Sequence, residues 1–348
     1  MNGEENRESL EEILTEGRKG VEVTEAELEE ARERRDDVAA ALMKAFPGAR
    51  VYVNGSVAHG DALTPLTDVD VGAVVPDPDG EYGPGKKGPS VLMDKSARVI
   101  REELRPTYGE LRVEVKDRKR SILVKFNEPV SDRAEDFTAD VIVAIDNPDA
   151  AGLFIPRWTS WDRSHPEEHT RMVKRAIKDT RTSYAHVARL LKRWNRANGK
   201  PLCSWNIKAL ALGCITAPTM QLQGLLNWFT FAIAELEKGE TKDPAGVAPK
   251  PIKLNEDMTR KQVVKLLADA REVLLEAIRF EKDGYPVLAH DTLARFFNDG
   301  VMLPRPDQAA VRQETADRFR KRQGVGVPAV GVGAGAARER VDAASWAP

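Results

Sequence analysis

Residues 51–75 read VYVNGSVAHGDALTPLTDVDVGAVV and hold the most informative pattern of the chain. The alternating valines at the start predict a strand that ends at Gly55 and Ser56, and Asp68 and Asp70 open the next strand. Because the side chains of a strand alternate between its two faces, both aspartates point the same way, while the valines between and after them face a core. The segment therefore predicts strand, turn and strand, with two carboxylates on one face.

Asp68 and Asp70 form a pair of carboxylates that repel each other unless a cation lies between them. Hard oxygen ligands with room for water suit Mg²⁺, or Mn²⁺ in its place, and Mg²⁺ prefers one or two carboxylates plus substrate phosphates. Gly55 lets the backbone approach a phosphate closely, and Ser56 offers a hydroxyl and a backbone N–H at a helix start. The arrangement is typical of a triphosphate held over a two-metal site.

A second metal ion needs a further ligand, and the predicted strand Thr138–Ile145 offers Asp140 on the face opposite its valines. Asp136 and Asp146 are the nearest alternatives, and Asp146 shares the face of Asp140 but lies at the strand end. The non-functional alternative for the acidic pair is a solvated edge strand or a turn. Strand context on both sides and a third acidic strand residue favour the metal site.

The remaining pattern predicts an α+β chain, with a sheet followed by a helical bundle. Five apolar or alternating runs predict the strands: Arg50–Val53, Val69–Val75, Leu111–Val115, Ser121–Phe126 and Thr138–Ile145. Four runs at helical spacing follow a longer helical stripe from Val173 to Trp194, at 207–215, 221–237, 261–282 and 308–323. We expect four regions: a helical element over 1–48, a sheet domain over 49–160, a helical domain over 161–305, and a terminal helix with a disordered Gly/Ala-rich tail over 306–348.

Charge is nearly balanced over the 348 residues, with 53 Lys and Arg against 55 Asp and Glu, so no whole-molecule field draws the chain onto nucleic acid. The distribution is uneven, because residues 1–37 carry 14 acidic and 6 basic side chains, whereas 171–200 carry 10 basic and 1 acidic. That basic run leaves a nucleic-acid activator open, although the same charges could bind triphosphate. Two cysteines, no signal-peptide pattern and no apolar span favour a cytoplasmic protein.

The spacing of Gly55, Ser56, Asp68, Asp70 and Asp140 resembles the motif hG[GS]…Dh[DE]h…h[DE]h of the DNA polymerase β-like nucleotidyltransferase superfamily. The chain is also similar to the oligoadenylate synthase and cyclic GMP-AMP synthase group, which includes the bacterial CD-NTases of antiphage CBASS systems. Four segments carry this second resemblance, in this order: Trp161–His169, Leu190–Asn195, Ser204–Leu210 and Asp243–Gly246.

The resemblance implies a polymerase β-like palm, a mixed sheet with helices, facing a C-terminal helical domain across a nucleotide cleft. By motif match, Lys192 and Ser204 contact the donor triphosphate. The implied activity joins NTPs, with two Mg²⁺ or Mn²⁺ ions and pyrophosphate release, into a cyclic or linear oligonucleotide that a separate effector protein reads. Two residues depart from the pattern, since Asp61 stands where many relatives have threonine and Lys208 where bacterial relatives often have glutamate.

Other functions remain open at this point. The acceptor could be an RNA 3′ end, a small-molecule hydroxyl or a protein hydroxyl, and the fold could serve as a non-catalytic nucleotide-binding module. Residues 80–86, GEYGPGK, match G-x-x-x-x-G-K of a P-loop, but Lys87 follows where a magnesium-binding Ser or Thr is needed. His59 lies close to Gly55 and is expected to be a hydrogen-bonded structural residue.

Overall fold

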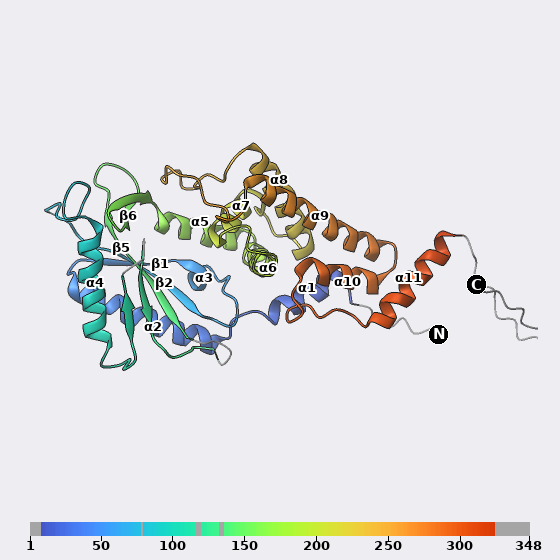
Figure 1. Cartoon of the computed structure of the whole chain (residues 1–348), viewed down its shortest axis with the longest axis horizontal. Helices are drawn as coiled ribbons and strands as arrows, with labels where there is room; N and C mark the ends of the chain where they lie inside the picture. Colours follow the sequence, from blue (N-terminus) through green and yellow to red (C-terminus); the bar gives the residue numbers. More distant parts are fainter. Residues whose placement is uncertain (1–7, 78, 116–119, 132–135, 324–348) are drawn as a thin grey trace, which may run out of the picture.

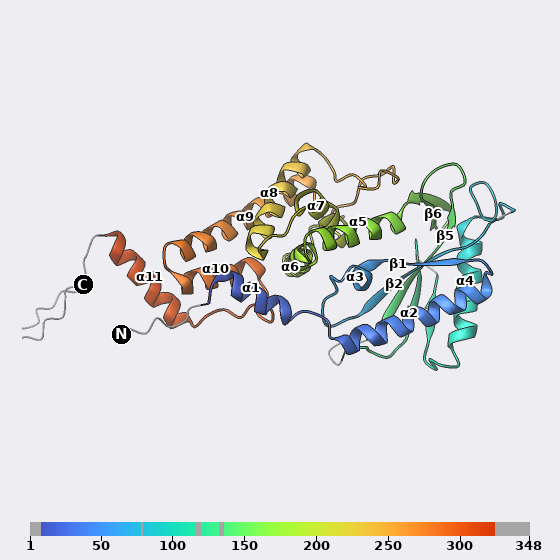
Figure 2. The ribbon, with the colours of Figure 1, turned by 180° about the vertical axis from the view of Figure 1, so that it is seen from behind.

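The computed structural model of the chain describes residues 8–77, 79–115, 120–131 and 136–323. Figure 1 shows two lobes side by side, one built on a β-sheet and one built of helices, and Figure 2 shows them from behind. We call them the palm lobe and the helical lobe. The tail predicted to be disordered, residues 324–348, lies outside the described residues.

Within the described residues, seven strands form one sheet, in which β2 and β5 pair in parallel and every other pair is antiparallel. The strands are β1 (Arg50–Val53), β2 (Asp68–Val74), β3 (Arg112–Glu114), β4 (Ile122–Lys125), β5 (Thr138–Asp146), β6 (Leu153–Arg157) and β7 (Ser160–Ser164). The order is β1-β2-β5-β4-β3, with β6 on β5 and β7 on β6. The five predicted strands are present, but β6 and β7 were not predicted, and β7 carries the sheet past residue 160.

Two long helices, α2 (Glu25–Ala45) and α4 (Gly88–Leu104), cover one face of the sheet. The valines of β2 and β5, among them Val69, Val71 and Val141, are buried against these helices. The alternation of side chains along β2 then turns Asp68 and Asp70 to the opposite face. In both views α2 lies on the far side of the sheet from α5 (Pro166–Asp179), so the sheet face that carries Asp68 and Asp70 is the one turned toward the helical lobe.

The N-terminal segment contains two helices rather than the single helical element predicted over residues 1–48. The helix α1 (Leu10–Lys19) ends at Gly20, and α2 starts afresh, because Ser9 with Glu12 and Thr24 with Glu27 each form a capping box. The two helices also belong to different lobes. Leu10 and its apolar neighbours pack into the core of the helical lobe, whereas α2 packs on the sheet.

The helical lobe consists of α1, α5 and the helices α6 to α10, packed around one apolar core. These are α6 (Ser183–Ala197), α7 (Ser204–Cys214), α8 (Gln221–Lys238), α9 (Arg260–Lys282) and α10 (Pro286–Phe297). Trp194 lies at the centre, edge-on to Phe229 with ring centroids 4.9 Å apart. The predicted stripe from Val173 to Trp194 is broken into α5 and α6 by a left-handed turn at Arg181 and Thr182.

The last described element, α11 (Gln308–Arg322), matches the predicted terminal helix and lies at the end of the helical lobe, where it contacts α10 and the end of α9 (Figure 1). Within the described part of the chain, no helix has both the length and the apolar composition needed to cross a bilayer. The α+β prediction, a mixed sheet with helices followed by a helical domain, is confirmed.

Candidate active site

The turn that joins β1 to the short helix α3 (Gly55–Ala58) lies directly against Asp70 of β2. Gly55 has φ +79°, and a Cβ built on it would lie only 1.7 Å from Oδ2 of Asp70. Glycine is therefore required twice here, by the backbone conformation and by the close approach of the Asp70 carboxylate. This contact places the hydroxyl-bearing Ser56 next to the second strand of the predicted motif.

The structure brings the three predicted carboxylates to one face of two neighbouring strands. In the parallel pairing of β2 with β5, Asp70 lies opposite Asp140, and Asp68 is two residues earlier on the same face of β2. Asp68 is exposed, whereas Asp70 and Asp140 are half-buried. The Ser121 hydroxyl donates a 3.1 Å hydrogen bond to Oδ1 of Asp140. We call Asp68, Asp70 and Asp140 the acidic face.

The electrostatics of Asp70 report the crowding of these carboxylates. Burial, followed by the negative charges of Asp68 and Asp140, raises the pKa of Asp70 to about 6. The positive charges of Lys208 and Lys192 oppose this rise without cancelling it. A bound cation would remove the repulsion, so the acidic face is built to favour one.

The donor chemistry of the acidic face fits Mg²⁺ or Mn²⁺. Among the described residues, no three His, Cys, Asp or Glu side chains are gathered closely enough to hold a metal ion by themselves. Magnesium seldom needs such a set, because it takes one or two carboxylates and completes its octahedral shell with water and substrate phosphates. Asp70 has a raised pKa and two carboxylates beside it. A bound Mg²⁺ or Mn²⁺ ion would therefore lower the pKa of Asp70.

The two alternatives to Asp140 are held elsewhere. Asp146 lies at the far end of β5, where Arg50 donates hydrogen bonds of 2.7 and 2.8 Å to its two oxygens. Asp136 precedes β5, and its Oδ1 accepts a 2.7 Å hydrogen bond from the backbone N–H of Phe137. Of the three candidates, Asp140 is therefore the one in register with Asp70.

Lys192 and Ser204, the two residues matched to triphosphate contacts, differ in their surroundings. Ser204 is exposed at the first turn of α7, where unpaired backbone N–H groups and the helix dipole favour an anion. Lys192 on α6 is buried, and its Nζ donates hydrogen bonds of 2.7 Å to the carbonyl oxygen and 3.0 Å to Oδ1 of Asp61. In the structure, the ammonium group of Lys192 is therefore bound to Asp61.

Sequence reasoning missed a buried charge cluster that consists of His59, Asp61, Lys192 and Lys208, each at most 5 % exposed. Burial alone would raise the pKa of Asp61, but the ammonium groups of Lys208 and Lys192 outweigh it and lower the pKa to about 2. The usable signal was present in the sequence, since Asp61 and Lys208 are the two departures from the family pattern and prove to be partners.

Tyr52 is a second residue that the sequence pattern did not single out. It lies on β1 opposite Gly72, and a Cβ on Gly72 would come within 2.0 Å of the Tyr52 ring, so the ring lies on the same side of the sheet as Asp70. The Tyr52 hydroxyl is buried without a hydrogen-bond partner in the described structure. The glycine thus makes room for an aromatic floor beside the acidic face.

Solved structures similar to this chain share its two-lobed fold. CdnC from Escherichia coli MS115-1, solved with ATP, is 16% identical with a TM-score of 0.60, covering 83% of this chain and 97% of that one. CdnG from Bradyrhizobium diazoefficiens, a CD-NTase solved with GTP, is 12% identical with a TM-score of 0.62, covering 88% and 99%. The cyclic AMP-GMP synthase DncV from Vibrio cholerae, solved with the linear intermediate pppA(3′,5′)pG, is 14% identical with a TM-score of 0.55, covering 84% and 86%.

No protein-family model matches the sequence, and no curated protein matches it at a significant level. The likeness to the three solved structures is therefore one of fold. The chain has the fold of the bacterial CD-NTases, an α+β polymerase β-like nucleotidyltransferase palm joined to a helical lobe.

Proposed function

We propose that this protein is a nucleotidyltransferase that joins NTPs into a cyclic or linear oligonucleotide and releases pyrophosphate. One observation carries the proposal: the Gly55 turn packs on Asp70 while Asp70 lies in register with Asp140, so a phosphate-binding turn and a carboxylate set share one face. Phosphoryl transfer requires little of a protein beyond holding a triphosphate, its cations and the attacking hydroxyl in line.

Each residue of the site has a part in this reaction. Asp68, Asp70 and Asp140 would hold two Mg²⁺ or Mn²⁺ ions, which when bound lower the pKa of the attacking ribose hydroxyl and stabilise the leaving pyrophosphate. Gly55 and Ser56 bring backbone N–H groups and a hydroxyl to the triphosphate at the start of α3. Ser204 approaches the same triphosphate from the first turn of α7 in the helical lobe.

The role of Lys192 in this proposal is electrostatic. Its ammonium group is committed to Asp61, but its positive charge reaches the acidic face, where it lowers the pKa of Asp70. A cation in a water-poor position behind the site favours the negative charge of a bound triphosphate without touching it. We therefore retain Lys192 as a contributor to nucleotide binding through charge.

The nature of the product is carried over from proteins of the same fold. DncV from Vibrio cholerae is a cyclic AMP-GMP synthase, and CdnE from Capnocytophaga granulosa is a c-di-GMP synthase. We propose a cyclic oligonucleotide second messenger for this chain as well, made in the cytoplasm and read by a separate effector protein in antiphage (CBASS) signalling. CdnC from Escherichia coli was solved in complex with a HORMA protein, so a protein partner of this kind is a further candidate.

Three of the ten basic side chains in the run over 171–200 are bound to carboxylates from distant parts of the chain. Lys192 is bound to Asp61, Arg189 to Glu22 and Arg193 to Asp299. Because these three side chains are paired within the protein, fewer positive charges of the run are available to bind the phosphates of a nucleic acid. We propose that the enzyme works on NTPs without nucleic acid.

The proposal is tested by incubating the purified protein with four labelled NTPs and Mg²⁺ or Mn²⁺, treating with phosphatase, and identifying resistant products by mass spectrometry. A phosphatase-resistant cyclic product that Asp68→Asn/Asp70→Asn does not make supports the proposal. A label transferred to added RNA or to a protein would instead identify another acceptor. NTP binding without turnover in every condition would leave a nucleotide-binding module and overturn the proposal.

A further inference from the structure

The buried charge cluster joins the two lobes directly behind the Gly55 turn. His59 and Asp61 follow α3 in the palm lobe, while Lys192 comes from α6 and Lys208 from α7 in the helical lobe. Nζ of Lys208 lies 3.2 Å from Oδ2 of Asp61 and 2.8 Å from Nδ1 of His59. One ammonium group of the helical lobe therefore holds two side chains of the palm.

These contacts reach both ends of the Gly55 turn. Because Lys208 donates to Nδ1 of His59, the ring proton sits on Nε2, which lies 3.0 Å from Oγ1 of Thr170. The Thr170 hydroxyl in turn donates a 3.1 Å hydrogen bond to the carbonyl oxygen of Val53, the last residue of β1. On the other side, the backbone N–H of Asp61 donates a 3.1 Å hydrogen bond to the carbonyl oxygen of Ser56.

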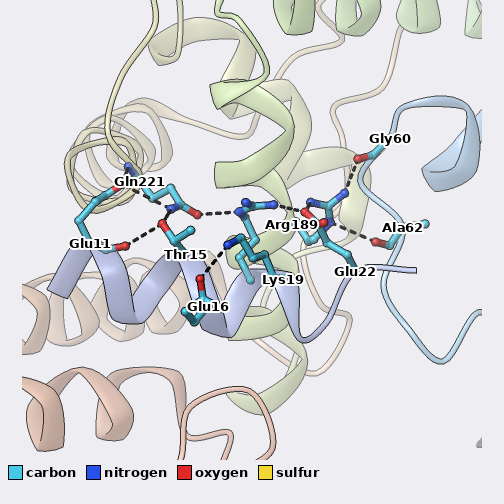
Figure 3. Close-up of polar contacts among 10 residues, drawn as sticks. Glu11, Thr15, Glu16, Lys19, Glu22, Gly60, Ala62, Arg189 and Gln221 are labelled. Atoms are coloured by element: carbon cyan, nitrogen blue, oxygen red, sulfur yellow. Dashed lines mark hydrogen bonds and ion pairs between the residues drawn. The ribbon is translucent and has the colours of Figure 1, made fainter. Parts of the chain in front are cut away.

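The segment after the turn has a further support from the helical lobe. Arg189 on α6 donates hydrogen bonds of 2.7 Å to the carbonyl oxygen of Gly60 and 3.2 Å to that of Ala62. Figure 3 shows Arg189 between these two carbonyls and Glu22, which also binds Arg18 of α1. The contacts of Arg189 hold the backbone, whereas those of Lys208 hold the side chains of His59 and Asp61.

Lys208 also has a fixed relation to the other half of the proposed nucleotide site. It follows Ser204 by four residues on α7, so the two side chains lie on the same face of the helix, one turn apart. Ser204 stands at the exposed start of α7, and Lys208 is anchored in the palm. The Lys208 anchor therefore determines how far the start of α7 lies from the Gly55 turn.

The geometry points to a specific role for this pair. We propose that Lys208 and Asp61 are positioning residues, which fix the Gly55–Ser56 turn of the palm relative to Ser204 of the helical lobe, so that one triphosphate meets both. The proposal rests on the proposed function and adds to it the device that keeps the two halves of the site in register. A salt bridge that is fully buried between the lobes suits this role, because separating its partners would leave charges uncompensated in a water-poor place.

The informative variant is Lys208→Met, because it leaves Asp61 paired with Lys192 and so leaves no uncompensated charge in the cluster. Three quantities are measured on it and on the wild type: thermal unfolding, the kcat and KM for product formation from NTPs, and amide hydrogen exchange over residues 53–62. Asp149→Asn, an exposed aspartate of the palm, is the matched control. Asp61→Asn is the second variant, and it tests the same contact from the palm side.

The positioning role predicts that Lys208→Met unfolds close to the wild type, exchanges amides faster over residues 53–62, and has a kcat about 10²-fold lower with a KM changed much less. A purely structural role predicts that activity follows stability, so a variant with wild-type unfolding and wild-type kcat overturns the proposal. Wild-type amide exchange over 53–62 overturns it as well.

Failure of the proposed function is recognised separately. If the wild type itself forms no product, nucleotidyl transfer fails, and the positioning role is then decided by amide exchange in Lys208→Met. Faster exchange confined to residues 53–62 supports it, and wild-type exchange over those residues contradicts it.

Discussion

Asp61 and Asp70 both lie beside the Gly55 turn and experience opposite electrostatic environments. Asp70 faces two other carboxylates, and its pKa is raised to about 6, whereas Asp61 is enclosed by two lysines and its pKa is lowered to about 2. Burial acts to raise the pKa of both carboxyl groups, so burial alone does not explain their opposite shifts. The sign of the neighbouring charge does.

Asp61 therefore already has cationic partners within the protein, whereas Asp70 has two carboxylates beside it and favours a bound cation. Asp61 has its counter-charges within the protein, so its removal would leave two buried ammonium groups uncompensated, and its contacts help to place the turn. Asp70 is unsatisfied and therefore costs stability, which is expected of a group that acts on a ligand. The Gly55 turn is thus held by contacts with the segment that contains Asp61, and it packs on Asp70 of the proposed metal site.

The largest expected effect concerns the satisfied side. Asp61→Asn leaves the ammonium groups of Lys192 and Lys208 buried without their counter-charge, and we expect a loss of about 3–5 kcal/mol in the free energy of unfolding. Urea denaturation measures it. Asp149→Asn, at an exposed position, should stay within about 0.5 kcal/mol of the wild type. Equal stability of the two variants would show that Asp61 is not a structural counter-ion.

The next prediction compares two aspartates of β5, Asp140 in the acidic face and Asp146 at the strand end. Asp140→Asn should lower the rate of product formation about 10³-fold, because it removes a ligand of the proposed metal site. Asp146→Asn breaks only an exposed pair with Arg50 and should change the rate little. Initial rates of pyrophosphate release compare the two. Similar losses in both variants would show that the strand end, and not the register with Asp70, matters.

A pair of glycines tests the contact between the turn and Asp70. Gly55 and Gly60 both have positive φ, so alanine at either position costs about 1–2 kcal/mol of backbone strain. At Gly60 a Cβ meets nothing within 4 Å, whereas at Gly55 it collides with Asp70. Gly55→Ala should therefore lose about 10²-fold in activity beyond Gly60→Ala. Matching kcat values for the two variants would argue against this contact.

The smallest effect concerns the unsatisfied side and depends on pH. The folded protein binds a proton at Asp70 more tightly than the unfolded chain does, because the pKa rises from 3.8 to about 6. Without metal, the stability of the wild type therefore falls as pH rises through this interval. Asp70→Asn should raise the free energy of unfolding by about 2–3 kcal/mol above pH 7, and by well under about 1 kcal/mol at pH 4.

Thermal unfolding at pH 8 and pH 4 without divalent ions checks this expectation. A gain that persists at pH 4 would mean that the asparagine stabilises through packing rather than through the removal of charge.

The strand faces of Asp68, Asp70 and Asp140 could be predicted from the sequence because each is a local property of its strand, whereas the pairing of the two strands was implied by the motif resemblance. The period of a strand places Asp68 with Asp70, and the valines around Asp140 identify its strand and its face. The strands β6 and β7 escaped prediction because β6 holds a proline and an arginine, and β7 holds two serines and two charged residues, instead of an alternating apolar run. The break between α1 and α2 was missed because apolar spacing continues across it, although two capping boxes mark it.

The buried cluster could not be predicted in the same way. Its members lie in α6, α7 and the segment after α3, and only the folded chain brings Lys208 to Asp61. The sequence showed each as an unusual residue, but pairing over such distances along the chain is a property of tertiary structure. Lys192 is an example. Its motif match predicted a triphosphate contact, and in the structure its ammonium group is bound to Asp61.

The contrast between the two aspartates is tested most directly by metal binding. Mn²⁺ is titrated into the wild type, Asp70→Asn and Lys208→Met with a non-hydrolysable ATP analogue present, and protein-bound Mn²⁺ is followed by electron paramagnetic resonance. We predict that Asp70→Asn loses the bound ion, because the carboxylate facing Asp140 holds it, and that Lys208→Met retains it. Bound Mn²⁺ in Asp70→Asn equal to that of the wild type would contradict the account.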